Sequence, residues 1–491
     1  MSLIKKLAGE TVIYGLSHIL SRVILFVVFT SYLTHKLSAD PSEYGIYSDM
    51  YSYATVILTI LVFRMDTAFF RFGSKSNDLQ KTFNTGFIAI LVFCIIVLII
   101  LLPNIDRLST WLHYNSSPHY IKWFAYILVL DAITALIFAR LRLTSRPYRF
   151  MFYKLFNVGL TILIVLLFLE FLPRFYPDIL TNINNYLGIT RQIDYVFLAN
   201  LIASAAVVII MIPEFKSFKF SFDIALFKKM GWYALPLVAV GVAGNVNQAF
   251  AAPIQKLFLG DNIIENLASV GIYAAAAKLA ILLNLFTTAF NYAAEPFFFK
   301  NADKKDSIKV YGKVALAFTI VACIVSLGLI FYIDLIILII GEGYRSGVYV
   351  VPILLFAYIF LGLYYNVSIW YKLKDKTYIG AMISFVGMSI TILMSIMLLP
   401  HIGAIGSAWA ALLCYIVMVV LGYLIGQKYY PVDYPVVKIL TYIATTALVS
   451  GLALYIRSII GVSPIYFIGV TVCILGVLYW IYKREYKIIT E

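Results

Sequence analysis

The sequence predicts an all-α polytopic membrane protein with about 14 transmembrane helices. Hydrophobic residues make up 62% of the 491 residues and charged residues only 13%, whereas soluble domains average about 45–50% and about 25%. Apolar stretches of helical length recur along the whole chain, and about 20 helical residues cross a hydrocarbon core about 30 Å thick. The connections between these stretches alternate between basic segments and segments with few basic residues.

The expected spans follow one another with short connections. They cover residues 12–34, 44–69, 82–103, 118–139, 151–171, 193–213, 227–250, 267–293, 309–333, 348–368, 377–399, 403–425, 435–456 and 462–482. The first stretch is longer than 20 residues and lacks a small-residue cleavage site, so we expect a retained helix and not a signal peptide. No connection is long enough for a separate domain, which places the function in the membrane or at its faces.

The distribution of basic residues predicts the topology. Of the 38 Lys and Arg residues, 27 fall in the two terminal segments and in or beside every second connection, Lys154 among them, and seven fall in the alternate connections. By the positive-inside rule, the basic segments and both termini face the cytoplasm. The net charge of +14 is spread over these short segments. This spread indicates topology and contact with anionic headgroups, and it argues against nucleic acid as a partner.

Two sequence matches indicate an internal duplication. Residues 44–47 resemble residues 270–273, and residues 143–163 resemble residues 373–393. The offsets, 226 and 230, nearly agree. Because each half would hold six spans, the halves would have the same orientation, as in parallel transporter repeats. We therefore expect an N-lobe at 1–220, a C-lobe at 221–430, and two extra spans with a cytoplasmic C-terminus at 431–491. Chance likeness between apolar helices is the alternative interpretation.

Two basic residues at mid-membrane carry most of the chemical information. Arg22 lies near the middle of the first span, with His18 on the same helix face. Lys278 lies near the middle of the eighth span, after four consecutive alanines. A central Arg costs about 2.5–3.5 kcal/mol on insertion scales. Arg and Lys at this depth predict an anionic ligand such as a phosphate. The structural alternative is ion pairing with Asp131 and with Asp66 or Asp49.

Further polar residues lie inside expected spans. Arg64 and Asp66 are near the cytoplasmic end of the second span, where Arg64 can also reach the interface by snorkelling. Asp131 is near mid-membrane in the fourth span. It is interpreted either as a structural partner of a basic residue or as an ion- or proton-coupling group.

Two other parts of the expected spans contain polar residues that are not basic. Asn245 and Asn247 end the seventh span and could bind sugar hydroxyls or tie helices together. The outer half of the second span, which includes Asp49, is too polar for lipid exposure. We expect that segment to line water or substrate.

The sequence lacks the signatures of the main enzyme classes. It contains no Walker A sequence, no GxSxG and no HExxH. The four cysteines lie inside spans without CxxC spacing or nearby histidine clusters, so neither a metal site nor a cofactor is predicted. We do not expect an enzyme, and a membrane-embedded glycan-modifying enzyme is the least favoured alternative.

Several short motifs resemble the Wzx-type flippases of O-antigen and capsule repeat units, which belong to the multidrug/oligosaccharidyl-lipid/polysaccharide (MOP) exporter superfamily. The resemblance spans essentially the whole chain. Its motifs are Gly9–Thr11 with Arg22, Glu43–Tyr47, Arg64–Arg71, Gly341–Tyr344, Leu361–Tyr365 and Lys374–Thr377.

The resemblance implies two six-helix lobes around a cationic cavity, and a monomer in the bacterial cytoplasmic (inner) membrane. The implied activity moves an undecaprenyl-pyrophosphate-linked oligosaccharide from the inner to the outer leaflet. Arg22 and Lys278 match the expected basic positions, and the last two spans would help to hold the polyprenyl tail. The coupling ion would be H+ or Na+. The alternative within the superfamily is a MATE-like exporter of organic cations, which the basic residues Arg22 and Lys278 disfavour.

Overall fold

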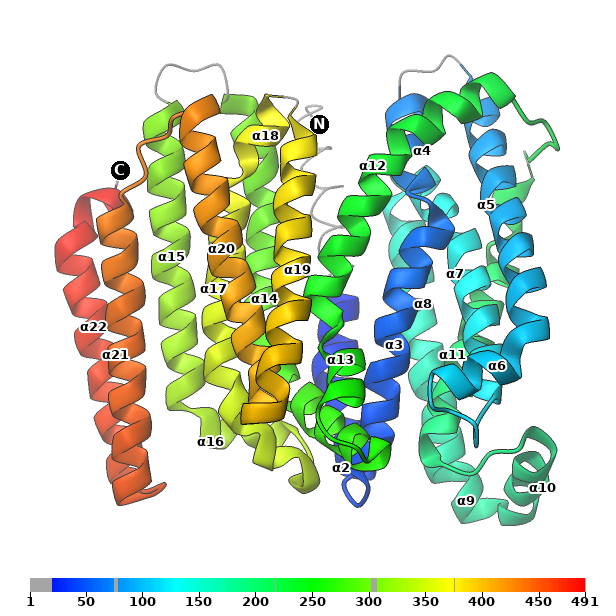
Figure 1. Ribbon diagram of the computed structural model, residues 1–491, viewed down its shortest axis with the longest axis horizontal. Helices are drawn as coiled ribbons and strands as arrows, with labels where there is room; N and C mark the ends of the chain where they lie inside the picture. Colours follow the sequence, from blue (N-terminus) through cyan, green and yellow to red (C-terminus); the bar gives the residue numbers. More distant parts are fainter. Residues whose placement is uncertain (1–19, 75–77, 217, 302–306, 375, 491) are drawn as a thin grey trace. The chain divides into compact units, whose positions relative to one another are not determined.

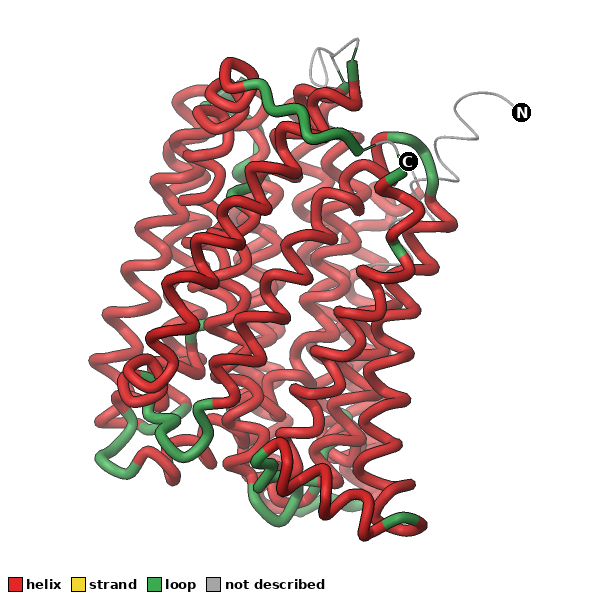
Figure 2. The backbone as a smooth tube through the Cα atoms, turned by 90° about the vertical axis from the view of Figure 1, so that its right-hand side faces the viewer, coloured by secondary structure: helices red, strands yellow, loops and turns green. Residues whose placement is uncertain are grey.

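The computed structural model describes residues 20–74, 78–216, 218–301, 307–374 and 376–490, and in these residues it contains helices and no strand (Figure 1). Figure 2 shows the same chain as long helices joined by short loops. The chain forms two compact units. Of the described residues, the first unit holds 20–29 and 42–271, and the second holds 30–41 and 272–490.

The first unit begins with a π-helical turn and continues through long helices that alternate with short connecting ones. Its elements are η1 (Ile24–Phe29), α3 (Pro41–Val62), α4 (Met65–Gly73), α5 (Leu79–Leu101), η2 (Leu102–Asn104), α6 (Ile105–Trp111), α7 (His119–Leu143), α8 (Pro147–Leu166), η3 (Leu167–Phe171), α9 (Leu172–Phe175), α10 (Pro177–Leu187), α11 (Gln192–Ile210), η4 (Ile212–Phe215), α12 (Ile224–Ala249) and α13 (Ala251–Phe258). The start of α14 (Ile263–Asn301) also belongs to this unit.

The second unit combines a short early helix with the later part of the chain. Its elements are α2 (Thr30–Lys36), the remainder of α14, α15 (Ser307–Phe331), α16 (Ile333–Ile336), η5 (Ile337–Ile339), η6 (Glu342–Tyr349), α17 (Val350–Val367), α18 (Ile369–Leu373), α19 (Thr377–Ile402), α20 (Ile405–Tyr429), α21 (Val436–Ile460) and α22 (Pro464–Thr490). The helix α2 joins this unit through the Gly341 and Gly343 backbone N–H groups, which donate to the side chains of Thr34 and Ser38.

The all-helical polytopic fold predicted from the sequence is confirmed. Among the described residues, 13 helical segments are long and apolar enough to cross a membrane. They correspond to the second to fourteenth expected spans. The first expected span begins in residues outside the described part of the chain, and its described end is η1 followed by α2. The chain is therefore a multi-pass membrane protein.

The compact units divide the chain at points other than the expected lobe boundary at residue 220. Residues 221–271 pack with the first unit, and residues 30–41 pack with the second. One reason is a close helix contact around Gly45 in α3. A Cβ atom at this position would lie only 1.8 Å from the Leu267 carbonyl oxygen and 3.2 Å from the Gly271 nitrogen. Gly45 and Gly271, which belong to the two similar motifs at 44–47 and 270–273, therefore lie close together in the first unit.

Local sequence signals explain where several helices begin and end. Asp78 and Asp223 are N-caps of α5 and α12, and their side chains accept hydrogen bonds from the Lys81 and Leu226 N–H groups at 2.9 and 2.8 Å. Lys81 also pairs with Asp223 at 2.7 Å, and this contact lowers the pKa of the Asp223 carboxyl. Gly403 ends α19 with a φ of 68°, which glycine adopts readily.

A buried ion pair fixes α3 against α13 within the first unit. Lys256 Nζ lies 2.5 Å from Asp49 Oδ2, and both side chains are fully buried. The Tyr114 hydroxyl donates to the same Asp49 oxygen at 2.6 Å, and Lys256 donates to the Leu112 carbonyl at 3.1 Å. The expectation that the Asp49 segment lines water or substrate is therefore wrong at Asp49 itself. Its Oδ2 atom is bound by partners from other elements, whereas Oδ1 is buried without a hydrogen-bond partner among the described residues.

The last two helices are joined to each other and to the second unit by charged contacts. Glu485 of α22 is buried and accepts hydrogen bonds from Lys438 and Tyr442 of α21 at 2.9 Å. Arg457, near the other end of α21, pairs with Asp334 of α16 through a bidentate contact. Both ends of α21 are thus anchored, while large apolar side chains along α21 and α22 stay exposed.

We expect Gly45→Ala to destabilise the protein, because the added methyl group would overlap the Leu267 carbonyl. Overpacking of this kind costs about 1–3 kcal/mol or more, and thermal unfolding of the purified protein in detergent measures it. Gly159→Ala in α8 is the matched control, since no atom lies within 4 Å of the position of its Cβ. An unchanged melting temperature for Gly45→Ala would contradict the close contact.

We expect Lys256→Met to be strongly destabilising, because it leaves the Asp49 carboxylate buried without its cation. Breaking such a pair typically costs about 3–5 kcal/mol, whereas replacing both partners with apolar residues is often close to neutral. The double variant Asp49→Leu with Lys256→Met should therefore regain stability in the same unfolding assay. Lys122→Met, at an exposed position in α7, is the control. Equal unfolding of the two Lys variants would refute the role of the pair.

Candidate functional site

The first unit contains a partly open cavity of about 320 Å³, which is lined by both polar and apolar side chains. This volume is at the lower end of the range of about 300–1,000 Å³ that is typical of small-molecule sites. Its wall is formed by the segment before and within η1 and by α3, α7, α8 and α11. The polar residues of the wall are Ser21, Arg22, Asp131, Thr134, Lys154, Asn157 and Ser204. Two cations and one carboxylate therefore line one cavity.

Arg22 and Asp131, both singled out in the sequence, come together in this cavity. Arg22 is partly exposed and contributes to the wall from the start of the described chain. An Arg at this depth thus faces a polar space within the protein, as the cost of exposing it to lipid requires. The structure places Arg22 in the first unit and Lys278 in the second, so these two predicted ligand residues come from different units.

Asp131 is held by a hydrogen-bonded series that crosses three helices. Ser204 Oγ of α11 lies 2.9 Å from Asp131 Oδ1 of α7 and 3.3 Å from Asn200 Oδ1. The Asn200 amide in turn donates to the Tyr51 hydroxyl of α3. These contacts fix the carboxylate at the edge of the cavity, with a neutral donor as its hydrogen-bond partner.

Lys154 is the cavity residue that sequence reasoning missed, because it was counted with the basic cytoplasmic loop. It lies in the second turn of α8, and its ammonium is 4.3 Å from the centre of the Phe138 ring. Lys154 interacts electrostatically with both Asp131 and Arg22. The available signal was helical spacing, since Asn157 and Val158, three and four residues later, line the same cavity.

Arg64 occupies a break between α3 and α4. Phe63 and Arg64 have φ values of 49° and 50°, a left-handed conformation that is uncommon for residues other than glycine. The Arg64 guanidinium packs against Gly241 of α12, where a Cβ atom would come within 2.5 Å of it. The second expected span is therefore interrupted at Arg64, and this side chain fills the contact between α4 and α12.

The other carboxylate considered for coupling, Asp66, lies apart from the cavity wall. It is in the first turn of α4, and its nearest described hydrogen-bond partner is the Thr67 hydroxyl at 3.4 Å. Asp66 is partly exposed and is not among the residues that line the cavity. Asp131 therefore lines the cavity, whereas Asp66 lies outside its wall.

The asparagines of α12 take part in helix contacts. Asn245 donates to the Thr59 hydroxyl at 2.6 Å and to the Thr55 carbonyl at 3.2 Å, both on α3. Asn247 is buried. Of the two interpretations given to these residues, tying helices together describes the contacts of Asn245. His18 lies outside the described residues.

Lys278 lies in the middle of α14 and is partly buried. Ala275 and Ala276, three and two residues before it, are fully buried, and small residues of this kind allow a close approach between helices.

In the described part of the chain, no group of three His, Cys, Asp or Glu residues could hold a metal ion, and Cys94, Cys323, Cys414 and Cys473 are free thiols.

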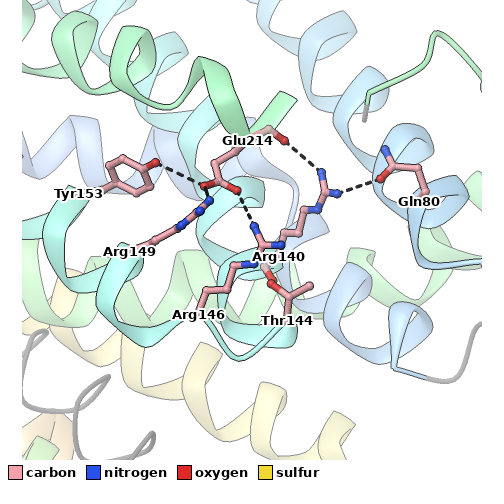
Figure 3. A network of polar contacts seen from close by, with 7 residues as sticks. All are labelled: Gln80, Arg140, Thr144, Arg146, Arg149, Tyr153 and Glu214. Carbon is pink, nitrogen blue, oxygen red and sulfur yellow. Dashed lines mark hydrogen bonds and ion pairs between the residues drawn. The ribbon is translucent and has the colours of Figure 1, made fainter. Parts of the chain in front are cut away.

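The basic connection after α7 folds onto the end of α11 around one carboxylate, Glu214 (Figure 3). Arg149 and Arg146 bind its two oxygens at 2.6 and 3.3 Å, and the Tyr153 hydroxyl lies 3.4 Å away. Arg140 donates to the Glu214 backbone carbonyl at 3.2 Å and to Gln80 at 2.9 Å. These contacts give the Arg residues of the predicted cytoplasmic segment a structural role, while Lys154 of the same segment turns to the cavity.

No protein-family model matches the chain, and no curated protein matches it in sequence. Solved structures do match it. The lipid II flippase MurJ in an inward closed conformation aligns with 96% of this chain and 99% of its own, with a TM-score of 0.69 and 16% identity. An inward-facing multidrug resistance MATE family transporter of the MOP superfamily aligns with 85% of this chain and 94% of its own, at a TM-score of 0.59 and 11% identity.

The Vibrio cholerae MATE transporter VcmN in its bent form is a third match. It aligns with 91% of this chain and 98% of its own, with a TM-score of 0.55 and 13% identity. These alignments cover nearly the whole length of both partners, at identities that establish the fold alone. The narrower resemblance to Wzx-type flippases stays a prediction. The chain has the polytopic helical fold shared by the lipid II flippase MurJ and the MATE transporters.

Proposed function

We propose that this protein flips an undecaprenyl-pyrophosphate-linked oligosaccharide repeat unit from the inner to the outer leaflet of the bacterial cytoplasmic membrane, for O-antigen, capsule or exopolysaccharide synthesis. The observation that carries the proposal is the cavity of the first unit, whose wall holds Arg22 and Lys154 against the single carboxylate of Asp131. Its net positive charge suits an anionic ligand. It occurs in a fold that also serves a lipid II flippase.

The physical argument concerns the cost of moving phosphate charge through the membrane. An isolated ion in a low-dielectric medium is strongly disfavoured unless it is paired. Arg offers a planar fork of donors that matches phosphate oxygens, and Lys offers a compact point charge. In this mechanism, Arg22 and Lys278 hold the diphosphate during passage. Arg64 and the basic cytoplasmic segments draw it from the inner leaflet.

The glycan and the lipid tail need different surroundings. We assign the glycan hydroxyls to polar residues near the predicted path, among them His18, Asn245 and Asn247. The polyprenyl tail stays in the membrane, against apolar surfaces such as those exposed along α21 and α22. Rocking of one lobe against the other provides alternating access. An ion gradient of H+ or Na+, or the membrane potential, supplies the energy, and Asp131 and Asp66 are the candidate coupling groups. The working unit is a monomer embedded in membrane lipid.

The main rival is a MATE-like exporter of small organic cations. The MATE transporters share the fold, and Asp131 supplies a carboxylate in the cavity. A cationic ligand there would meet Arg22 and Lys154 as well, and like charges in a desolvated space repel strongly. The charge of the wall therefore favours the lipid-linked anion.

Cells that lack this protein should accumulate a complete repeat unit on undecaprenyl pyrophosphate, because its movement to the outer leaflet is blocked. Mass spectrometry of extracted lipids measures this accumulation and identifies the sugars. Wild-type protein should clear it, whereas Arg22→Ala and Lys278→Ala should reduce clearance about 10- to 100-fold. The loss of a charge-assisted hydrogen bond costs about 1.5–3 kcal/mol.

Exposed basic residues provide matched controls for both variants. Arg174→Ala and Lys428→Ala remove the same side chains from exposed positions and should clear the lipid normally. Each variant is compared at equal abundance in the membrane. Absence of the accumulated lipid, together with a new sensitivity to cationic dyes, would overturn the flippase and support the cation exporter. Normal clearance by both Arg22→Ala and Lys278→Ala would overturn the assigned ligand residues.

A further inference from the structure

Lys154 has no role in the mechanism above, although its position is unusual for a basic residue near the cytoplasmic side. It lines the same cavity as Arg22 and interacts electrostatically with it, despite the repulsion between two cations in a partly buried space. Asp131 is the one carboxylate in the cavity wall. The cavity therefore carries one uncompensated positive charge when Asp131 is ionised, and two when Asp131 is protonated.

We propose that the cavity of the first unit is a binding site for a phosphate-type anion, clamped between Arg22 and Lys154, and that Asp131 competes with the anion for these two cations. This inference deepens the proposed function, on which it rests for the biological source of the anion. The site itself is defined by residues of one compact unit and needs no other part of the chain.

The remaining wall fits such a ligand. The Asn157 amide carries N–H groups that can donate to anion oxygens. The Thr134 and Ser204 hydroxyls donate instead to the Asp131 backbone carbonyl and to the Asp131 carboxylate, each at 2.9 Å, and so hold Asp131 at the edge of the site. Phe138 lies against the Lys154 ammonium at 4.3 Å and limits its freedom to move. A volume of about 320 Å³ leaves space for a tetrahedral anion together with bridging water.

The competition follows from the groups that face Asp131. The charged or titratable groups are Arg22 from the segment before η1, Lys154 from α8 and Tyr51 from α3. From α11, the neutral side chains of Asn200 and Ser204 complete the surroundings. The elements α4, α5 and α6 also pack on α7 but contribute no described residue to the wall. Arg142 of α7 adds a further positive charge that acts on Lys154. The ionised carboxylate thus attracts the same cations that an anion needs.

This arrangement determines whether protonation of Asp131 strengthens or weakens the binding of the anion. Protonation of Asp131 removes the negative charge that acts on Lys154 and raises the net positive charge of the cavity. The anion therefore binds more tightly at lower pH, and by linkage the bound anion favours the protonated carboxyl. A proton therefore travels with the anion and not against it. Of the energy sources named in the proposed function, this coupling rules out an inward proton gradient that acts through Asp131, because such a gradient cannot drive outward movement of an anion that binds together with the proton. The membrane potential, which favours outward movement of negative charge, can do so.

The test uses full-length purified protein and inorganic sulfate, a tetrahedral anion whose charge is constant over the range used. Calorimetry at about pH 6 and about pH 8 measures its dissociation constant. Wild type should bind about tenfold more tightly at the lower pH. Asp131→Asn keeps an oxygen that accepts from Ser204, and it should bind tightly at both values. Lys154→Gln should bind at least about tenfold more weakly at both values, Lys154→Arg should restore binding, and the exposed Lys228→Gln should match wild type.

Unchanged sulfate affinity in Lys154→Gln would overturn the site, and a persistent pH dependence in Asp131→Asn would overturn the competition.

Farnesyl diphosphate and inorganic pyrophosphate are then compared as sources of the anion. Tighter binding of the lipid diphosphate, lost in Lys154→Gln, identifies the lipid carrier, and equal binding identifies a free anion. The assay requires no transport, so it separates the two proposals. Lipid-linked glycan that accumulates in cells while sulfate fails to bind would sink this inference and leave the proposed function standing.

Discussion

The hydrocarbon core of a membrane offers no hydrogen bonds, so every polar group that this chain places there must be satisfied by the protein itself. The backbone meets this requirement by forming helices. The side chains meet it by pairing across helices, as Asp49 does with Lys256 and Asp131 with Ser204. The same requirement explains why the polar residues lie between helices, whereas the lipid-facing surfaces of α21 and α22 are apolar.

Three carboxylates of the first unit illustrate different ways to meet this constraint. Asp49 is neutralised by a buried Lys and accepts a further hydrogen bond from Tyr114, which makes it a structural tie between α3 and α13. Glu214 gathers two Arg side chains at the end of α11 and shapes the connection after α7. Asp131 instead has a neutral hydroxyl as its hydrogen-bond partner and shares an open space with two cations. That difference marks Asp131 as the carboxylate with a charge still available to a ligand or a proton.

Sequence reasoning identified the spans well, because hydropathy over a helical length is a local property. Each described span lies within a few residues of its expected position, and caps such as Asp78 and Asp223 were available signals. Sequence reasoning was less successful in predicting where helices end and where a span is interrupted. The interruption at Phe63 and Arg64 depends on the packing of the Arg64 guanidinium against Gly241, a residue far along the chain. Lys154 was assigned to a loop because proximity to other basic residues outweighed its helical spacing.

The sequence by itself determined the fold class, the spans and the expected topology, since these follow from the length of apolar segments and the placement of Lys and Arg. It also determined that charge is present at membrane depth, at Arg22 and Asp131. Only the tertiary structure decided which charges meet: Asp49 with a Lys 207 residues away, and Arg22 with Asp131 and Lys154 in one cavity. The physical reason is that lipid and helix interfaces are both apolar, so the sequence of a membrane helix does not show which of its faces a neighbour will cover.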